Sequence, residues 1–414
     1  MISKSEISQI IADQRDLGFK ASDLPRLKST NTDREIEVIS GIRRCGKSTL
    51  LHEIRSTNRE KDYYFNFDDE RLVKFTVADF QLLYEVFIEM FGKQKTFYFD
   101  EIQNIEGWER FVRRLHDYNN KVYITGSNAS MLSRELGTHL TGRYYQTELF
   151  PFSFREFLLF RKKSVPEKPD FNTEEKIKLH TSFLEFFNMG GFPFYLKSGS
   201  TQYLKSLYES IIYRDVLVRN GLKNDKEVLE LVHFLASNTS KLVSYNGLTK
   251  IIGVKNASTI KSYLDFIQNT YLLFTLSKYD RSLKKQLQNP KKTYFIDLGL
   301  IREIGFHHSE DNGRLLENLV FIELKRRNKE VFYHYQKHEC DFVLKEKNKI
   351  VEAIQVCWSI HNDATRKREL LGMSDALKTY DLTEGLILTN DEEDTITENG
   401  YTIHIKPTWK WLLD

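Results

Sequence analysis

The sequence predicts an α/β protein in which a parallel sheet comes first, followed by helical segments and a second α/β unit. The first observation is a set of short, nearly continuous apolar segments rich in β-branched and aromatic residues, at 35–40, 63–67, 96–99 and 122–125. Strands that are buried on both faces have this composition. The second observation is the amphipathic character of the stretches between them, such as 81–91 and 108–117, which supplies the crossover helices of a parallel sheet.

The length and charge of the chain limit its class. Domains usually run to about 100–200 residues, so a chain of 414 residues predicts two to four of them. Its 40% hydrophobic and 29% charged residues are globular proportions, which exclude a disordered or fibrous protein. The formal net charge of +3 excludes a uniformly basic coat but leaves room for one local basic surface that binds nucleic acid.

Cysteine usage and hydropathy predict a cytoplasmic protein. Cys45, Cys340 and Cys357 are far apart and form no CxxC pair, so neither a disulfide framework nor a zinc knuckle is expected. Residues 1–15 carry several charges and lack the apolar run of a secretion signal. The most apolar stretch, 183–196, is interrupted by polar residues and is shorter than the roughly 20 residues of a membrane span.

Residues 41–48 fit the phosphate-loop (Walker A) pattern G-x-x-x-x-G-K-[ST] between a predicted strand and a predicted helix. Glycines let successive backbone N–H groups face phosphate oxygens, Lys47 reaches the terminal phosphates, and the Ser48 hydroxyl can bind Mg²⁺. The alternative is a glycine-rich structural turn. The candidate nucleotide-binding residues are Gly41, Arg44, Gly46, Lys47, Ser48 and Thr49.

A second carboxylate-bearing segment has the character of a Walker B strand. The apolar strand at 97–99 delivers Asp100 and Glu101 at its carboxyl end, where α/β sheets place ligands. We expect Asp100 to hold Mg²⁺, through water or Ser48, and Glu101 to orient and deprotonate the attacking water. The alternative is a solvated strand end without a metal.

Two further residues are candidates for the same reaction. Asn128 follows the strand at 122–125 and is expected to sense the γ-phosphate or position water, although it could also cap a helix at 131–136. Arg143 is the candidate for charge stabilisation of the transferring phosphoryl group, in the manner of an arginine finger, and it acts from a neighbouring subunit if the protein assembles. The alternative for Arg143 is an ordinary surface arginine.

The loop arginines Arg43 and Arg44 are further cations near the phosphates. Alternatively, they pair with the acidic residues at 68–70.

The middle of the chain has helix-turn-helix spacing. Apolar residues at 248–264 fit two short helices that are joined by a turn at Gly253. The second helix exposes polar side chains that suit phosphates or base edges, namely Lys255, Asn256, Ser258, Thr259, Lys261 and Ser262. Segments 272–279 and 293–296 could form the wing of a winged helix, and the residues around and between them include the cations Arg281, Lys284, Lys285, Lys291 and Lys292. Double-stranded DNA is the expected partner, and the alternative is a packing or protein-docking module.

The last hundred residues follow the order of a restriction-endonuclease-like metal site. Glu317 lies on a predicted helix, and Glu339 and Asp341 begin a strand. An active site of this kind ends in Glu-x-Lys, but the corresponding positions here are Gln355 and Cys357. A neutral amide is a poor ligand for a hard cation and a thiol cannot replace an ammonium, so we expect a degenerate nuclease fold.

Two other side chains bear on this nuclease-like site. Glu352 could substitute for the lost acid, which leaves an active nuclease as the alternative. His334 and His338 are too isolated to predict zinc.

The chain resembles the AAA-type ATPases of bacteria and archaea that carry a C-terminal domain of unknown function. The resemblance rests on motifs at 41–48, 66–72, 99–103, 126–128, 140–143, 150–157, 190–193, 213–216 and 409–413. It covers nearly the whole chain. It implies an α/β P-loop NTPase fold of the ASCE/AAA type, ATP and Mg²⁺ as cofactors, and hydrolysis in a cytoplasmic machine. It also implies a winged helix and a restriction-endonuclease-like fold behind the ATPase.

The expected organisation has five parts: an N-terminal helical segment at 1–30, the P-loop ATPase core at 31–153, a helical lid or linker at 154–225, a winged-helix-like module at 226–300 and a degenerate restriction-endonuclease-like domain at 301–414. The expected function is ATP hydrolysis that controls how the C-terminal modules engage a partner such as DNA, with a homo-oligomer as an expected assembly and no membrane segment. The alternatives are an ATP-gated DNA nuclease and a DNA-binding or defence regulator that binds ATP without hydrolysing it.

Overall fold

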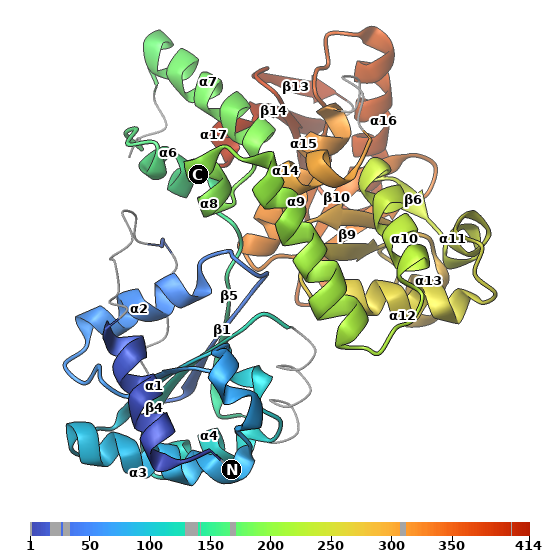
Figure 1. Ribbon diagram of the computed structural model, residues 1–414. Coiled ribbons are helices and arrows are strands. Elements are labelled where there is room, and N and C mark those ends of the chain that lie inside the picture. The colour runs from blue at the N-terminus through green and yellow to red at the C-terminus, as the bar shows by residue number, and fades with distance from the viewer. Residues whose placement is uncertain are drawn as a thin grey trace. The chain divides into compact units, whose positions relative to one another are not determined.

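The computed structural model describes residues 2–16, 26–27, 34–128, 140, 142–165, 171–306, 312–398 and 400–414 (Figure 1). The chain divides into two compact units. The first comprises Met1–Phe150 with Asn269–Tyr271, and the second comprises Pro151–Gln268 with Leu272–Asp414. The division after residue 150 lies close to the predicted end of the ATPase core. The finer five-part division stays a prediction.

The first unit is built on a parallel five-stranded sheet in the order β2-β3-β4-β1-β5. The strands are β1 (Ile36–Ser40), β2 (Tyr64–Asn66), β3 (Thr96–Asp100), β4 (Lys121–Gly126) and β5 (Tyr144–Glu148). All four pairings between neighbouring strands are parallel. The first four strands lie where the apolar segments predict them, which confirms the parallel α/β fold. The edge strand β5 was not predicted, because its polar sequence YYQTE leaves most of its residues only partly buried or exposed.

Helices connect these strands. The α-helices are α1 (Lys4–Asp16), α2 (Lys47–Thr57), α3 (Phe80–Phe91) and α4 (Trp108–Asp117), and the short 3-10 turns are η1 (Glu70–Lys74), η2 (Val77–Asp79) and η3 (Ile102–Asn104). Helix α4 shows why the sequence folds this way. Trp108, Phe111, Val112 and Leu115 recur at the spacing of one helix face, and all four are buried in the core of the first unit.

The sheet places functional segments at one edge. Because β1, β3 and β4 are parallel neighbours, their carboxyl ends lie together, with Ser40 of β1 opposite Gly126 of β4. The phosphate loop, the Asp100–Glu101 pair and residues 127–128 follow directly from these three ends. Ligands of open α/β sheets bind outside such carboxyl ends.

The second unit begins with helices. They are α6 (Phe154–Phe160), α7 (Thr173–Met189), α8 (Pro193–Ser198), α9 (Thr201–Ser210), the π-helical η4 (Ile211–Val218) and α10 (Asp225–Ser237). Ser153 and Asn172 start α6 and α7 with capping boxes, in which each side chain accepts the N–H of a glutamate three residues on. Among the described residues, no helix is both long enough and apolar enough to cross a bilayer.

The middle of this unit holds two short helices and a small sheet. Helix α11 (Tyr245–Ile252) ends at Gly253 in the left-handed conformation, and α12 (Ala257–Gln268) follows after a short turn. The antiparallel sheet has the order β6-β8-β7, with strands β6 (Leu242–Val243), β7 (Leu273–Ser277) and β8 (Lys291–Phe295). A short helix, α13 (Leu283–Gln288), lies between β7 and β8, and α14 (Leu298–Ile304) follows the sheet.

A six-stranded mixed sheet occupies the last part of the chain, in the order β13-β14-β12-β11-β10-β9. Its strands are β9 (Glu330–Tyr335), β10 (Glu339–Glu346), β11 (Lys349–Val356), β12 (Glu384–Thr389), β13 (Asp394–Glu398) and β14 (Tyr401–Pro407). The accompanying helices are α15 (Asn312–Arg326), α16 (Asp363–Tyr380) and α17 (Thr408–Trp411). This arrangement confirms the predicted second α/β unit, although β13 and β14 were not predicted.

Candidate functional site

The phosphate loop leaves β1 at the carboxyl edge of the sheet and ends at the start of α2. Gly41 and Gly46 have φ angles of +152° and +105°, which L side chains rarely adopt. A Cβ atom on Gly41 would lie 2.1 Å from the carbonyl oxygen of Leu149, which follows β5. The loop therefore passes so close to the neighbouring backbone that only glycine fits at position 41.

Lys47 is buried in the first turn of α2. Its ammonium Nζ donates to the Ile42 carbonyl oxygen at 3.2 Å and lies 3.4 Å from Glu101 Oε1. Burial alone would lower the pKa of Lys47, but the neighbouring acidic groups, with Glu101 first among them, together outweigh burial and the net shift is upward. Lys47 is thus a charged group that is held inside the loop by an acidic partner.

Asp100 lies beside the loop at the end of β3. Its Oδ1 accepts a hydrogen bond from the Ser48 hydroxyl at 3.1 Å and another from the Thr125 hydroxyl, and its Oδ2 accepts one from Tyr64 at 3.4 Å. Burial, with a contribution from the Glu101 charge, raises the pKa of Asp100 to about 6. A buried carboxylate beside a hydroxyl is a hard-oxygen pair of the kind that Mg²⁺ prefers, so Ser48 and Asp100 fit a magnesium ion.

Glu101 differs from Asp100 in its electrostatic environment. Its Oε2 accepts hydrogen bonds from Ser127 Oγ at 3.1 Å and from Gln103 Nε2, and its backbone N–H donates to Thr125 at 2.9 Å. Burial raises the pKa of Glu101, but Lys47 and these donors outweigh burial, and the net shift is downward. Glu101 therefore stays ionised when Asp100 takes up a proton. Two adjacent carboxyl groups with opposite shifts are suited to different roles.

The other predicted residues lie at different distances from this centre. Thr49 lies in the first turn of α2, and Arg44 lies exposed on the loop with a φ angle of 66°. Asn128 is buried after β4, at the same edge as the Asp100–Glu101 pair. The helix predicted at 131–136 lies outside the described residues.

Arg143 is not brought to this site. It precedes β5, and its carbonyl oxygen accepts the N–H of Ile36 at 2.9 Å, so it lies at the amino edge of the sheet. Its Nε is 3.3 Å from an oxygen of Asp117, the last residue of α4. A five-residue strand separates the two edges by about 16 Å at roughly 3.3 Å per residue. The position of Arg143 gives it no part in the site of its own chain.

Sequence reasoning missed Arg26, which supports the outside of the phosphate loop. Its guanidinium donates to the carbonyl oxygens of Cys45 at 2.5 Å and Phe150 at 2.8 Å, and the side chain is buried. No spacing in the sequence indicates this long-range contact. Asp69 was one of the acids considered as an alternative partner of the loop arginines. The structure does not support that pairing, because Asp69 forms its ion pair with Arg71 at 2.8 Å.

The sequence also did not indicate which side chains donate hydrogen bonds to the two carboxylates. These donors are Thr125, Ser127, Tyr64 and Gln103. Thr125 and Ser127 lie next to a predicted strand end and could have been found by asking which hydroxyls face Asp100 and Glu101.

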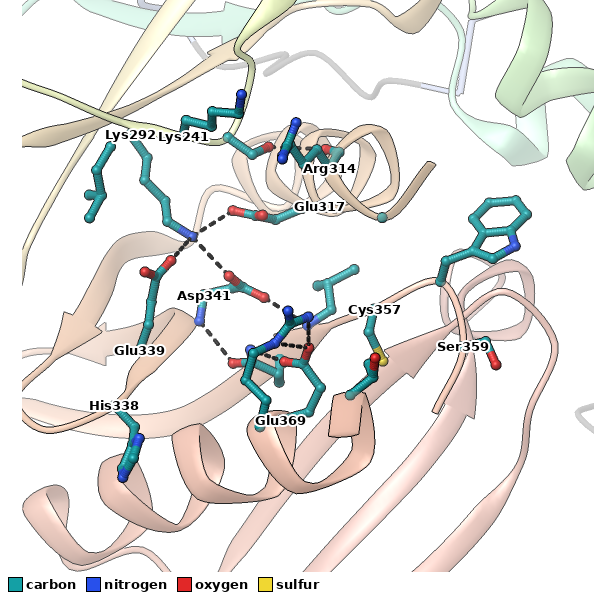
Figure 2. Close-up of a pocket in the computed structure, with 18 residues that line it drawn as sticks. Lys241, Lys292, Arg314, Glu317, His338, Glu339, Asp341, Cys357, Ser359 and Glu369 are labelled. Carbon is teal, nitrogen blue, oxygen red and sulfur yellow. Dashed lines mark hydrogen bonds and ion pairs between the residues drawn. The ribbon is translucent and has the colours of Figure 1, made fainter. Parts of the chain in front are cut away.

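A second polar cluster lies in the second unit, around a cavity of about 720 Å³ (Figure 2). Its lining includes the predicted nuclease-like residues Glu317, Glu339, Asp341, Gln355 and Cys357. The structure thus brings these side chains together from the region of α15, β10 and β11. This is the succession of a helix and two strands that the sequence predicted.

Glu352 does not belong to this cluster. It lines a different cavity, which it shares with Glu384 and Lys410. The suggestion that Glu352 replaces the lost acid of the nuclease-like site is therefore wrong.

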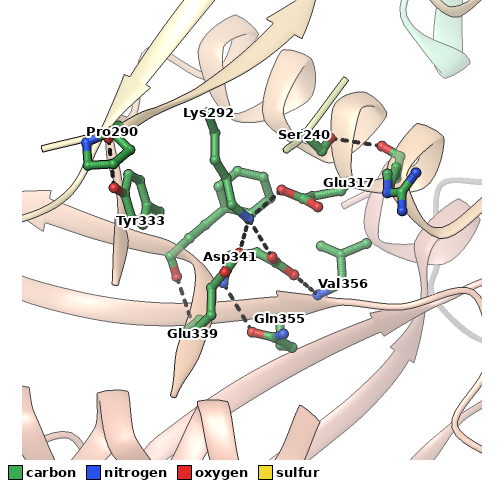
Figure 3. A network of polar contacts seen from close by, with 12 residues as sticks. Ser240, Pro290, Lys292, Glu317, Tyr333, Glu339, Asp341, Gln355 and Val356 are labelled. Atoms are coloured by element: carbon green, nitrogen blue, oxygen red, sulfur yellow. Dashed lines mark hydrogen bonds and ion pairs between the residues drawn. The ribbon is translucent and has the colours of Figure 1, made fainter. Parts of the chain in front are cut away.

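Two of the five cations assigned to the proposed wing are not surface groups. Lys291 and Lys292 are both buried. Lys291 donates to Ser277 Oγ at 3.0 Å, and Lys292 points into the carboxylate cluster (Figure 3). His334, for its part, contacts Asp375 and Tyr380 in a network of hydrogen bonds.

Comparisons with known proteins agree with this architecture. Residues 33–158 match a family described as an AAA domain, and residues 180–309 and 312–409 match two domains of unknown function, DUF8612 and DUF4143. Uncharacterized protein MJ1544 of Methanocaldococcus jannaschii is 33% identical over 100% of this chain and 96% of its own length. The chain belongs to the MJ1544 family.

A further member of the MJ1544 family comes from a bacterium. An uncharacterized protein of Haemophilus influenzae is 33% identical over 83% of this chain and 87% of its own length. The resemblance to AAA-type proteins with C-terminal domains of unknown function is thereby confirmed. The first unit has a P-loop NTPase fold.

Solved structures give only distant likenesses. The Aeropyrum pernix ORC2 protein in its ADP form aligns with a TM-score of 0.32 at 11% identity, over 66% of this chain and 86% of that chain. CDC6P from Pyrobaculum aerophilum aligns with a TM-score of 0.25 at 12% identity, over 73% of this chain and 93% of that chain.

Proposed function

We propose that the first unit binds ATP with Mg²⁺ and hydrolyses it, and that the bound nucleotide controls how the second unit engages a partner. One observation carries the proposal. A phosphate loop, a buried lysine, a hydroxyl and two carboxyl groups with opposite pKa shifts meet at the carboxyl edge of one parallel sheet.

The roles follow from the contacts. The loop N–H groups and the start of α2 face an anion, and Lys47 exchanges Glu101 and the Ile42 carbonyl for phosphate oxygens. Ser48 and Asp100 would hold Mg²⁺, which supplies charge neutralisation at the phosphates. Glu101 stays ionised and orients the attacking water as its base. Asn128 contributes a polar amide at the same edge.

Arg143 fits this scheme only across a subunit interface. Its side chain is one-third exposed at the amino edge, so its guanidinium is available to the site of a second copy once it leaves Asp117. We therefore propose a homo-oligomer in which Arg143 stabilises charge in the neighbouring site. We also place the protein in the cytoplasm, which three buried free cysteines support.

The test compares two variants of the ATP site. Glu101→Gln should bind ATP as the natural protein does but lose about 10²–10⁴-fold in turnover, because the base is removed while the loop is intact. Lys47→Ala should lose nucleotide binding itself. Unchanged phosphate release by Glu101→Gln would remove Glu101 from its role. ATP binding without turnover in the natural protein, with every partner added, would favour the non-hydrolysing regulator.

Double-stranded DNA is the partner that the second unit fits best. Helix α12 and the turn before it expose Lys255, Asn256, Ser258, Lys261 and Ser262, as the helix-turn-helix reading predicts, and Thr259 there is partly buried. Arg281 and the α13 residues Lys284 and Lys285 are also exposed. We propose that this winged-helix-like module lays α12 against DNA and adds backbone contacts from α13.

Salt dependence of binding tests this contact. Five exposed cations predict a slope of log affinity against log salt of about −4.5, and Lys261→Ala should reduce it by about 1. Lys93→Ala, an exposed lysine on the first unit, is the matched control. A slope near zero would exclude DNA. Nicking of supercoiled plasmid that Asp341→Ala abolishes would instead favour an ATP-gated nuclease.

A further inference from the structure

Lys292 occupies the centre of the carboxylate cluster in the second unit (Figure 3). Its ammonium Nζ lies 2.8 Å from Glu317 Oε1, 2.6 Å from Glu339 Oε1 and 2.8 Å from Asp341 Oδ1. The Lys292 side chain is only 2% exposed. It comes from β8 of the small antiparallel sheet, whereas its partners lie on α15 and β10. One cation therefore gathers three acids from two other elements.

Two of the three acids around Lys292 accept a hydrogen bond from a second donor as well. Glu317 Oε1 also accepts the Tyr294 hydroxyl at 2.6 Å. The second oxygen of Asp341 accepts the backbone N–H of Val356 at 3.0 Å. A divalent ion binds through oxygen lone pairs, and several of those on Glu317 and Asp341 accept N–H and O–H groups instead. The arrangement therefore suits an ammonium better than a metal.

Gln355 stands where a nuclease of this kind has its second acid. Here its side-chain amide forms structural hydrogen bonds. Its Oε1 accepts the backbone N–H of Asp341 at 3.1 Å, and its Nε2 donates to Glu369. Arg368 pairs with the same Glu369 carboxylate. The amide thus links β10 to α16 beside the cavity of Figure 2.

The charges in the cluster are consistent with this arrangement. Burial would lower the pKa of Lys292, but Asp341 and Glu317 outweigh burial and raise it well above its ordinary value, so the ammonium is retained at neutral pH. Burial, followed by repulsion from Asp341, raises the pKa of Glu317 to about 8.

We propose that Lys292 is a built-in cation that takes the place of a divalent metal ion among Glu317, Glu339 and Asp341, so that this cavity works without a metal. The fixed ammonium performs the charge neutralisation that a metal would supply, while it also ties β8 to α15 and β10. The proposal accounts for Gln355 and Cys357, because a site without a metal needs neither the second acid nor the second cation. It does not depend on ATP hydrolysis.

The test measures Mn²⁺ binding by electron paramagnetic resonance on the nucleotide-free full chain. All samples carry Asp100→Asn, which removes the carboxylate of the phosphate-loop site. With Lys292 present, we expect no Mn²⁺ binding that depends on Asp341. With Lys292→Ala, we expect one new Mn²⁺ site per chain that a further Asp341→Asn removes. Asp341-dependent binding in the chain that keeps Lys292, or no gain in Lys292→Ala, would overturn the proposal.

A second measurement, urea unfolding, tests the proposal even if Lys292→Ala does not fold. Urea unfolding of Lys292→Met should show a lower midpoint than the natural chain, because the buried Glu317 and Asp341 and the partly exposed Glu339 lose their cation. Adding Glu317→Gln and Asp341→Asn to Lys292→Met should restore part of that loss. Chelation of divalent ions should leave the natural midpoint unchanged. Equal midpoints for Lys292→Met and the natural chain, or a midpoint that falls on chelation, would contradict the proposal.

Discussion

The shifted pKa of Asp100 predicts that Mg²⁺-dependent nucleotide binding weakens in mildly acidic solution. Asp100 has a pKa of about 6 in place of its ordinary value of 3.8 because it is buried next to Glu101. Mg²⁺ competes with the proton for this carboxylate, so affinity should fall as the pH falls through 6. At pH 5 roughly one Asp100 in eleven is ionised, which predicts about tenfold weaker binding than at pH 8. An aspartate with the ordinary value would stay more than about 90% ionised at pH 5 and would change the affinity very little.

Calorimetric titration with ATP and Mg²⁺ from pH 8 to pH 5 measures the effect. The terminal phosphate of ATP also gains a proton in this range, with a pKa near about 6, so the same titration of Asp100→Asn provides the control. The ratio of the two affinities isolates Asp100. A ratio that stays constant down to pH 5 would refute the electrostatic reasoning about this site.

Three further predictions concern the phosphate loop, its support by Arg26, and Arg143. Gly41→Ala should lower the thermal midpoint and weaken ATP binding, because its Cβ would lie 2.1 Å from a carbonyl oxygen. Gly92→Ala, at a position with a positive φ but open space, should lower the midpoint less. Equal effects of the two substitutions would contradict the close contact. Arg26→Ala should weaken ATP binding by loosening the loop, and calorimetry that finds natural affinity would show that this support is dispensable. Arg143→Ala should lose turnover but keep ATP affinity, and mixing it with Lys47→Ala should restore some activity if the sites are shared; no restoration would argue against an intersubunit role.

The phosphate-loop site could be predicted from the sequence largely because its parts are local. The loop that leads to Lys47 begins directly after β1, and Asp100 ends β3, and a parallel sheet brings such strand ends to one edge. The strand β5 escaped notice because edge strands expose polar residues. Without β5, the sequence could not show that Arg143 lies at the opposite edge from Lys47.

The cluster in the second unit was predictable only in part. The order of Glu317, Asp341 and Gln355 indicated a nuclease-like arrangement. Lys292 looked like one more lysine of a basic surface loop, because its position in the sequence says nothing about which acids it meets in space. Its burial depends on pairing between β8 and β7 and on packing against α15, and these are long-range contacts.

The Lys292 contact also limits how the second unit can respond to a signal. If the helix-turn-helix region were to swing away from the mixed sheet, an ammonium and its acids would be pulled apart inside the protein, at a cost of about 3–5 kcal/mol. We therefore expect the helix-turn-helix region and the mixed sheet to move together as a rigid body when nucleotide is bound or released. Shortening the chain just after residue 300 should for the same reason yield an insoluble fragment instead of a separable DNA-binding module.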